Sequence, residues 1–347
     1  MSKKQKNKII KPEQKDLFSE VSSLIERSKT NVQVYVNSTL TLLYWHIGKR
    51  INEDVLQNKR AEYGKQIVSS LAVQLTAQYG RSYEVRNLRR MMQFAELFPE
   101  LEIVSPAVTQ LSWSHFIDIL SVKTPEARQF YANAAVEGRW TRRQLQRQIA
   151  TKAYERTELA NLQIGTSSII PPNIFKDPYI LDFLELKDIY LEKDLETAIL
   201  RELENFILEL GTGFAFVERQ KRIILDGEDF YLDLLFFHRK LRRLVAVELK
   251  LGKFEAKHKG QIELYLKYLD RYEKQESEKS PIGLLLCAGE SREQIELLEM
   301  HKDGILVAEY MTGLPPKKEL EAKLHSLLIE ARERLLMKDV VKTITKE

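Results

Sequence analysis

The chain has 347 residues, of which 44% are hydrophobic and 30% are charged, as in soluble globular proteins with room for two domains. Its single cysteine, Cys287, excludes a disulfide framework and a cysteine-based zinc site. The basic N-terminus lacks the apolar stretch of a signal peptide, and no later segment has the apolar length of a membrane span. We therefore expect a soluble, cytoplasmic protein without membrane contact.

The net charge of +4 conceals an asymmetry between the two parts of the chain. Residues 1–157 carry 25 Lys and Arg against 15 Asp and Glu, which gives +10, whereas residues 158–347 carry 29 against 35, which gives −6. A basic excess suits a surface that meets phosphate backbones, because neutralised phosphates release their counterions. A solubilising surface with a basic tail would produce the same count, so the charge alone leaves both interpretations open.

Residues 14–149 have the pattern of successive helices with short connectors. The segment 63–80 carries apolar residues mostly on one helical face and ends at Gly80, and the segment 82–100 offers Ser82 as an N-cap. A helix, a tight glycine turn and a basic helix form the outline of a helix-turn-helix unit. The arginines from which we predict DNA contact are Arg81, Arg86, Arg89 and Arg90. An arginine stripe is also typical of a solvated face in a helical bundle, so both interpretations remain.

The composition changes between Arg156 and Tyr179, where three prolines and a cluster of Ser, Thr and Asn are unfavourable for a helix. We therefore predict a helical DNA-binding domain over residues 14–157, a linker over 158–178 and a second domain over 179–340. The charged stretch from about Lys317 is expected to form an amphipathic helix.

Two apolar strands of the second domain each carry acidic side chains. A helical pattern over 191–210 precedes an alternating strand over 214–225 and a hairpin turn at Asp226 and Gly227. The strand that follows has one acid, Asp233, in its middle, and the strand after it contains Glu248 and Lys250. Residues two apart on a strand point to the same face, so the last two side chains lie together.

An aspartate on one strand and Glu-x-Lys on the next can serve a phosphodiester hydrolase. The Asp233 and Glu248 carboxylates can hold one Mg²⁺ or Mn²⁺, with the backbone carbonyl of Leu249 as a third protein ligand. The metal would polarise the scissile phosphate and lower the pKa of a bound water. Lys250 could orient that water, help to deprotonate it or stabilise the developing charge. An internal Glu–Lys ion pair, or acids that face solvent, would also fit this pattern.

The segment 257–274 has a helical pattern that places Gln261 and Tyr265 four residues apart on one face, and a strand over 281–289 follows. The order helix, three antiparallel strands, helix and strand resembles the core of the PD-(D/E)XK nucleases, an α/β restriction-endonuclease-like fold. Gln-x-x-x-Tyr resembles an addition in several branches, in which this helix lies against the active site and helps to position nucleic acid. Ordinary packing of the two side chains is the alternative.

The stretch 230–270 resembles the YhcG-type branch of this superfamily more specifically. The chain also resembles the N-terminal domain of that family at residues 42–51, 61–75, 87–94 and 110–116. The resemblance therefore covers most of residues 15–335. The resemblance implies catalytic roles for Asp233, Glu248 and Lys250, nucleic-acid binding by an all-α N-terminal domain, and a genome-defence or restriction-modification setting. Many members add an acid from the first helix of the nuclease core. The sequence does not choose among the four candidates Glu196, Glu202, Glu204 and Glu209.

The function expected from these patterns is a Mg²⁺-dependent endonuclease that acts on DNA without an organic cofactor. Cutting both strands usually needs two active sites, so we expect a homodimer, with the C-terminal helix as a candidate interface. Two alternatives remain: a catalytically silent DNA-binding or partner-docking protein on a nuclease scaffold, and a nuclease that acts on RNA or in transposition.

Overall fold

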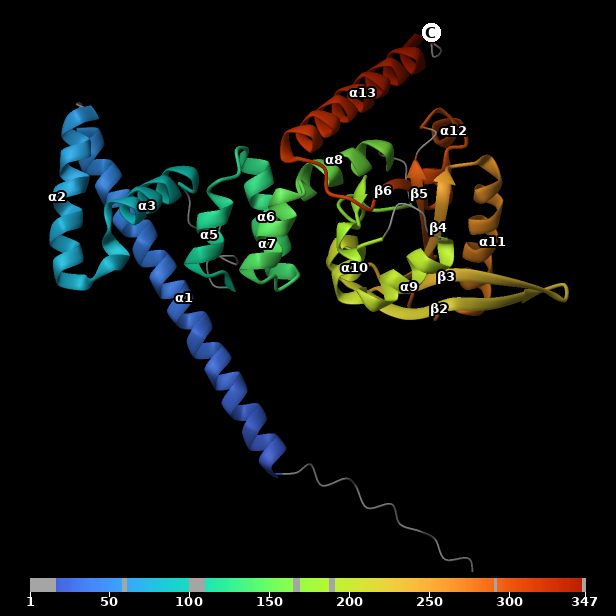
Figure 1. Cartoon of the computed structure of the whole chain (residues 1–347), viewed down its shortest axis with the longest axis horizontal. Helices are drawn as coiled ribbons and strands as arrows, with labels where there is room; N and C mark the ends of the chain where they lie inside the picture. Colours follow the sequence, from blue (N-terminus) through green and yellow to red (C-terminus); the bar gives the residue numbers. More distant parts are fainter. Residues whose placement is uncertain are drawn as a thin grey trace, which may run out of the picture. The chain divides into compact units, whose positions relative to one another are not determined.

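The computed structural model describes residues 17–57, 61–99, 110–164, 169–186, 191–289 and 292–344. The chain divides into two compact units, Met1–Pro125 and Glu126–Glu347 (Figure 1). The predicted basic N-terminal tail lies outside the described residues. None of the helices in the described ranges is long and apolar enough to cross a membrane.

The first unit is helical, as predicted. It contains α1 (Leu17–Gln57), α2 (Ala61–Tyr79), the 3-10 turn η1 (Arg81–Tyr83), α3 (Val85–Leu97) and α5 (Trp113–Ile119). Apolar side chains of the first three α-helices form its core, which includes Tyr44, Ile51, Val68, Ala72, Leu88 and Met91. Gly80 ends α2 with a φ of 92°, a left-handed conformation that glycine adopts without strain. The predicted Ser82 N-cap is wrong, because Ser82 lies inside η1 and Glu84 precedes α3.

The second unit begins with three helices and continues into a six-stranded sheet. The helices are α6 (Pro125–Glu137), α7 (Arg142–Ala150) and α8 (Ala153–Ile164). Two strands, a 3-10 turn and two α-helices complete its first half: β1 (Tyr179–Ile180), η2 (Asp182–Leu184), α9 (Glu192–Arg201), α10 (Leu203–Leu210) and β2 (Phe214–Leu225). The rest consists of β3 (Glu228–His238), β4 (Arg243–Lys253), α11 (Ala256–Tyr272), β5 (Ile282–Gly289), α12 (Arg292–Leu297), η3 (Met300–Asp303), β6 (Ile305–Met311) and α13 (Lys317–Ile344).

The sheet has the order β1-β6-β5-β4-β3-β2. β2, β3 and β4 are antiparallel neighbours, whereas β4, β5 and β6 run parallel, so the sheet is mixed. The hairpin between β2 and β3 turns at Asp226 and Gly227, both with positive φ, as the sequence predicted. The predicted order of helix, three antiparallel strands, helix and strand is therefore confirmed.

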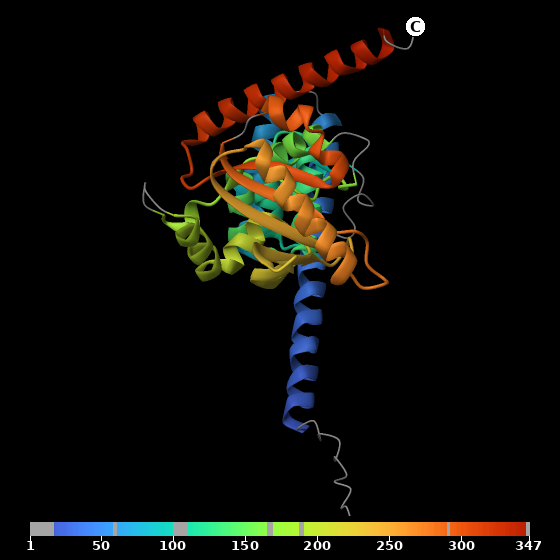
Figure 2. The ribbon, with the colours of Figure 1, turned by 90° about the vertical axis from the view of Figure 1, so that its right-hand side faces the viewer.

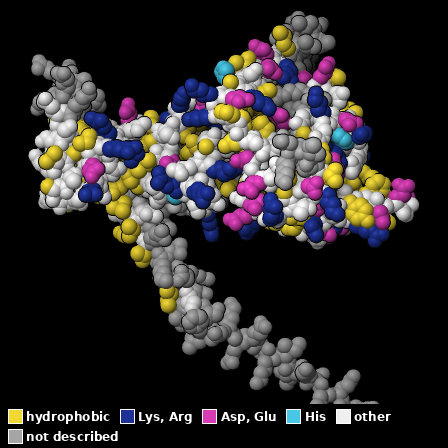
Figure 3. All heavy atoms as spheres, viewed as in Figure 1, with side chains coloured by type: hydrophobic (Ala, Val, Ile, Leu, Met, Phe, Trp, Pro, Cys, Tyr) yellow, Lys and Arg dark blue, Asp and Glu magenta, His cyan; other side chains and the backbone are white. Residues whose placement is uncertain are grey.

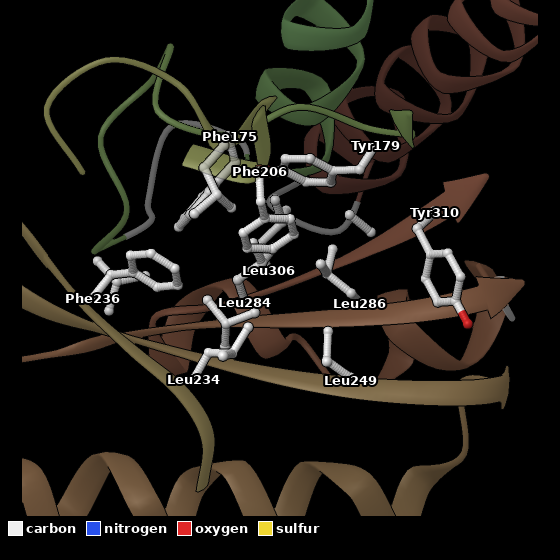
Figure 4. Close-up of a cluster of buried hydrophobic side chains, with 14 of the residues drawn as sticks. Phe175, Tyr179, Phe206, Leu234, Phe236, Leu249, Leu284, Leu286, Leu306 and Tyr310 are labelled. Atoms are coloured by element: carbon white, nitrogen blue, oxygen red, sulfur yellow. The ribbon is translucent and has the colours of Figure 1, made fainter. Parts of the chain in front are cut away.

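Helices cover both faces of this sheet (Figures 1 and 2). On one face, α9 and α10 contribute Leu195 and Phe206 to a core that includes Leu234, Val247 and Leu284 (Figure 4). On the other face, α11 contributes most of the helical side chains, among them Ile262, Tyr265 and Leu269. The β4 strand, which is buried on both faces, thus carries its polar residues between two apolar layers.

The helix α8 ends within residues 158–178, the stretch predicted as a linker. The helix continues to Ile164, and both Ala160 and Ile164 pack into the core of the second unit. The prolines that interrupt helical structure come later, at positions 171 and 172. The division into compact units falls after Pro125, so α6, α7 and α8 lie with the nuclease-like sheet. The predicted domain limits remain a prediction.

Candidate active site

The strands β3 and β4 diverge at the residues singled out by sequence. Their pairing runs from His238 and Arg243 to Leu234 and Val247, and stops there. The next residue on β3 is Asp233, and its Oδ2 accepts a hydrogen bond of 2.8 Å from the backbone N–H of Leu249. A carboxylate therefore occupies the fork between two buried strands.

Glu248 lies beside the fork and is 2% exposed. Its Oε1 accepts hydrogen bonds of 3.0 Å from Lys250 Nζ and of 3.0 Å from Gln261 Nε2. Gln261 also donates to the Tyr265 hydroxyl at 2.9 Å, and that hydroxyl donates to the Tyr231 carbonyl at 3.1 Å. The structure thus connects the Gln-x-x-x-Tyr pair of α11 to the Glu-x-Lys pair of β4.

Asp233 connects to a different set of residues. Its Oδ1 accepts a hydrogen bond of 3.1 Å from Gln220 Nε2 on β2, and the same nitrogen donates to Glu196 Oε2 on α9 at 2.9 Å. An open pocket of about 620 Å³ is lined by Glu192, Lys193, Glu196, Thr197, Arg219, Gln220 and Asp233. Among the four first-helix candidates, Glu196 shares this pocket with Asp233. Glu192, the first residue of α9, also lines the pocket and was not among the candidates predicted from the sequence.

The other three first-helix candidates lie elsewhere. Glu202 follows α9 and contacts Asn205 and Arg201, and Glu204 is exposed. Glu209 is buried in an ion pair with Arg156 and does not line this pocket. The sequence offered no signal that separates Glu196 from these acids, since all four have similar helical surroundings.

The surroundings of Asp233 and Glu248 disfavour the ionised form of both acids when no metal cation is bound. Burial raises the pKa of Glu248 to about 7, and the nearby Asp233 charge adds to this effect. Burial also raises the pKa of Asp233, although the Leu249 N–H opposes the shift. Burial lowers the pKa of Lys250, but the Glu248 and Asp233 carboxylates outweigh it and the net shift is upward. Lys250 is therefore a protonated, cationic group at neutral pH.

The donor set fits a divalent cation that binds few protein ligands. Glu248 Oε2 is buried and has no hydrogen-bond partner among the described residues, and Asp233 accepts from neutral amides. A cation would satisfy such oxygens, and Mg²⁺ commonly takes one or two carboxylates and keeps several waters. In the described part of the chain, no three His, Cys, Asp or Glu side chains gather closely enough to form a larger metal site.

The predicted DNA-contacting arginines lie in the first unit. Arg81, Arg86 and Arg89 are exposed and Arg90 is half-buried, at η1 and along α3. In the second unit, basic and acidic side chains are mixed over the face in view (Figure 3). On this face of the second unit, the charges therefore do not outline a basic patch.

Two family models match the chain: the YhcG PDDEXK nuclease domain over residues 172–325 and the DUF1016 N-terminal domain over residues 20–156. A protein of Escherichia coli (strain K12) named "Putative nuclease YhcG" is 37% identical over 343 residues, covering 87% of this chain and 91% of that protein. The chain belongs to the YhcG family of PDDEXK nucleases. The predicted family and fold class are therefore confirmed.

A solved structure, that of a repair endonuclease from Pyrococcus abyssi, is also similar to this chain. The match has 23% identity and a TM-score of 0.26, and it covers 38% of this chain and 50% of that one. A likeness of this size carries no argument about the site. The assignment to the YhcG family rests on the family models and the Escherichia coli relative.

Proposed function

We propose that this nuclease is a Mg²⁺- or Mn²⁺-dependent endonuclease acting on DNA, with Asp233, Glu248 and Lys250 at its reaction centre. The observation that carries the proposal is the fork between β3 and β4, where the buried Glu248 and the half-buried Asp233, both with raised pKa values, meet one cationic lysine. A buried acid whose pKa is raised by burial and by a neighbouring acid is typical of functional sites. Glu196 is proposed as a further acid that faces the same pocket.

The two carboxylates and the Leu249 carbonyl would hold the cation, which supplies charge to polarise the scissile phosphate and to acidify an attacking water. Lys250 is held by Glu248 at 3.0 Å, so its ammonium group has a fixed direction. Because its pKa is raised, Lys250 suits orientation of the water and stabilisation of the charge on the phosphate better than proton abstraction.

Gln261 and Tyr265 are proposed to keep the Glu248 side chain in place. Gln261 donates to Glu248 Oε1 and to Tyr265, and Tyr265 is anchored on the backbone of β3 through Tyr231. This chain of hydrogen bonds leaves Glu248 Oε2 as the oxygen that can turn to a cation. An ordered network of this kind restricts the rotamers of the reacting groups.

The choice of DNA is supported by the +10 charge of residues 1–157 and by the exposed arginines of η1 and α3. Binding through Arg81, Arg86, Arg89 and Arg90 is therefore part of the proposal. A homodimer, a restriction-modification or genome-defence partner and a cytoplasmic location remain predictions from the sequence and the family resemblance.

The test is cleavage by the purified protein and its Lys250→Ala variant on duplex, single-stranded and branched DNA and on RNA, each with Mg²⁺, Mn²⁺ or EDTA. We expect metal-dependent cleavage of DNA, reduced by a factor on the order of 10³ in the variant because an electrostatic contact is lost. The matched control is Lys253→Ala, an exposed lysine of the same strand, which should cleave normally. Cleavage of RNA alone would reassign the substrate, and silence on all forms would favour a binding scaffold.

A further inference from the structure

Gln220 has a backbone conformation that is unusual for its place in the sheet. It lies within β2, yet its φ is 44°, in the left-handed region. The pairs Arg219 with Leu234 and Lys221 with Leu232 place it opposite Asp233, and the register shifts just before, between Phe216 and Glu218. A non-glycine residue with positive φ is uncommon, and such residues gather at functional sites.

The Gln220 side chain stands between two acids that come from different elements. Its Nε2 donates to Glu196 Oε2 at 2.9 Å and to Asp233 Oδ1 at 3.1 Å, so the two hydrogens of one amide serve two carboxylates. The residue is exposed and lines the open pocket, so it adds little to either core. The hydrogen bonds of its side chain therefore act on Glu196 and Asp233 rather than on the packing of the cores.

A donor amide between two carboxylates occupies the kind of position that a cation occupies. The amide hydrogens carry partial positive charge and keep the acids of Asp233 and Glu196 close together. A divalent cation would repel those hydrogens, whereas amide oxygen is a hard ligand that Mg²⁺ and Mn²⁺ accept. Half a turn about the terminal torsion of Gln220, which is soft, exchanges nitrogen and oxygen without moving the backbone.

We propose that Gln220 is a switchable ligand of the cation site, which turns its Nε2 to Asp233 and Glu196 in the free protein and its Oε1 to the cation. The left-handed backbone and the adjacent bulge aim the side chain at the acids in both states. The proposal rests on the proposed function, because it assigns a role within the same metal site.

The experiment measures metal binding by the full-length protein in the absence of nucleic acid. Calorimetry with Mn²⁺ gives the affinity, and the luminescence lifetime of bound Eu³⁺ in H₂O and D₂O gives the number of coordinated waters. In Gln220→Met, which keeps the side-chain length without the amide, we expect roughly tenfold weaker Mn²⁺ binding and about one more water on Eu³⁺. Gln220→Glu should restore the wild-type water number and bind Mn²⁺ at least as tightly as the wild type.

The matched control is Thr197→Val, a residue of the same pocket whose hydroxyl donates to the Lys193 carbonyl and not to the acids. It should leave the affinity and the water number unchanged. An unchanged water number in Gln220→Met, with Mn²⁺ still bound, would overturn the ligand role of Gln220 alone. Absence of Mn²⁺ binding by the wild-type protein would instead overturn the proposed function together with this inference.

Discussion

The second unit buries two acid–lysine clusters, and they differ in how well the acid is compensated. Glu209 is 1% exposed and pairs with Arg156, itself fully buried, and its Oε1 also accepts the Ile180 N–H at 3.0 Å. Its Oε2 has no hydrogen-bond donor among the described residues, but Lys176 Nζ lies 3.7 Å away. Burial raises the pKa of Glu209, yet the two cations outweigh it and the net shift is downward.

Glu248 is about as buried as Glu209, and its pKa moves in the opposite direction. One cation, Lys250, faces it, and burial, together with the charge of the second acid Asp233, raises its pKa to about 7. The two cations beside Glu209 compensate its negative charge. Glu248 has one cation and one further acid beside it, so its negative charge is less well compensated. This difference is the one expected between a buried ion pair that stabilises the fold and the cation site that we propose at Glu248.

The pKa values of the lysines in the two clusters, Lys176 and Lys250, also shift in opposite directions. Burial lowers the pKa of Lys176 to about 8, although Glu209 opposes the shift, and Lys176 Nζ donates to the Glu209 carbonyl at 2.5 Å. Lys250 is less buried and its pKa is raised by its two acid neighbours. The cluster around Glu209 therefore has an excess of positive charge, and the one around Glu248 an excess of negative charge.

The largest expected effect on stability comes from removing Arg156. Arg156→Met leaves Glu209 buried beside one partly desolvated lysine, and we expect the free energy of unfolding to fall by about 3–5 kcal/mol. Urea unfolding of the full-length protein, followed by far-UV circular dichroism, measures this change. A loss of this size would show that the buried ion pair between Arg156 of α8 and Glu209 of α10 stabilises the second unit.

The control for this variant is Arg222→Met, which removes an arginine from an exposed pair with Asp229. Surface pairs contribute little, so its effect should stay below about 1 kcal/mol. Equal losses in Arg156→Met and Arg222→Met would contradict the view that the buried pair holds α8 to α10.

A smaller effect, of opposite sign, is expected for Glu248→Gln in the metal-free protein. The folded pKa of about 7 lies above the unfolded value, so the folded state binds more protons and stability falls as the pH rises from about 4.5 to 7. A neutral amide avoids this loss. Above pH 7 the free energy of unfolding of the variant should therefore exceed that of the wild type by at most about 3 kcal/mol. Melting temperatures in EDTA from pH 5 to 8.5 measure the difference.

The same variant should lose the stabilisation that added Mn²⁺ gives the wild type, because a ligand is removed. Glu276→Gln, an exposed residue of the loop after α11, serves as the control and should keep the wild-type pH profile. A Glu248→Gln protein that is less stable than the wild type at every pH would place Glu248 among the structural ion pairs, with Glu209.

The sequence predicts the acids of the fork because a lone carboxylate in an apolar strand is conspicuous. Asp233 and Glu248 stand out within β3 and β4 for this reason, and the spacing of Gln261 and Tyr265 predicts a shared helical face. The position of this helix beside the acids was expected from the resemblance to the PD-(D/E)XK nucleases. The structure adds the hydrogen bonds between the elements, such as that from Gln261 to Glu248.

Contacts between distant segments were beyond the reach of such patterns. Arg156 and Glu209 are 53 residues apart, and the alternation of β2 gives no sign of the bulge or the left-handed conformation that turn Gln220 toward the acids. The choice of Glu196 among four similar acids likewise depends on how α9 packs on the sheet. Tertiary packing, rather than residue type, decides each of these cases.

The smallest expected effect on stability comes from the exposed or half-buried arginines of α3 in the first unit, which contrast with the buried Arg156. Changing Arg86, Arg89 and Arg90 together to Ala should alter the free energy of unfolding by less than about 1 kcal/mol, since no buried acid depends on them. If α3 contacts phosphates, the slope of log K against log salt concentration for duplex DNA should become shallower by roughly 2–3. Fluorescence anisotropy from 50 to 300 mM KCl measures the slope. The control, Lys317→Ala with Lys318→Ala on α13, should keep the wild-type slope, and an unchanged slope in the arginine variant would move the DNA surface away from α3.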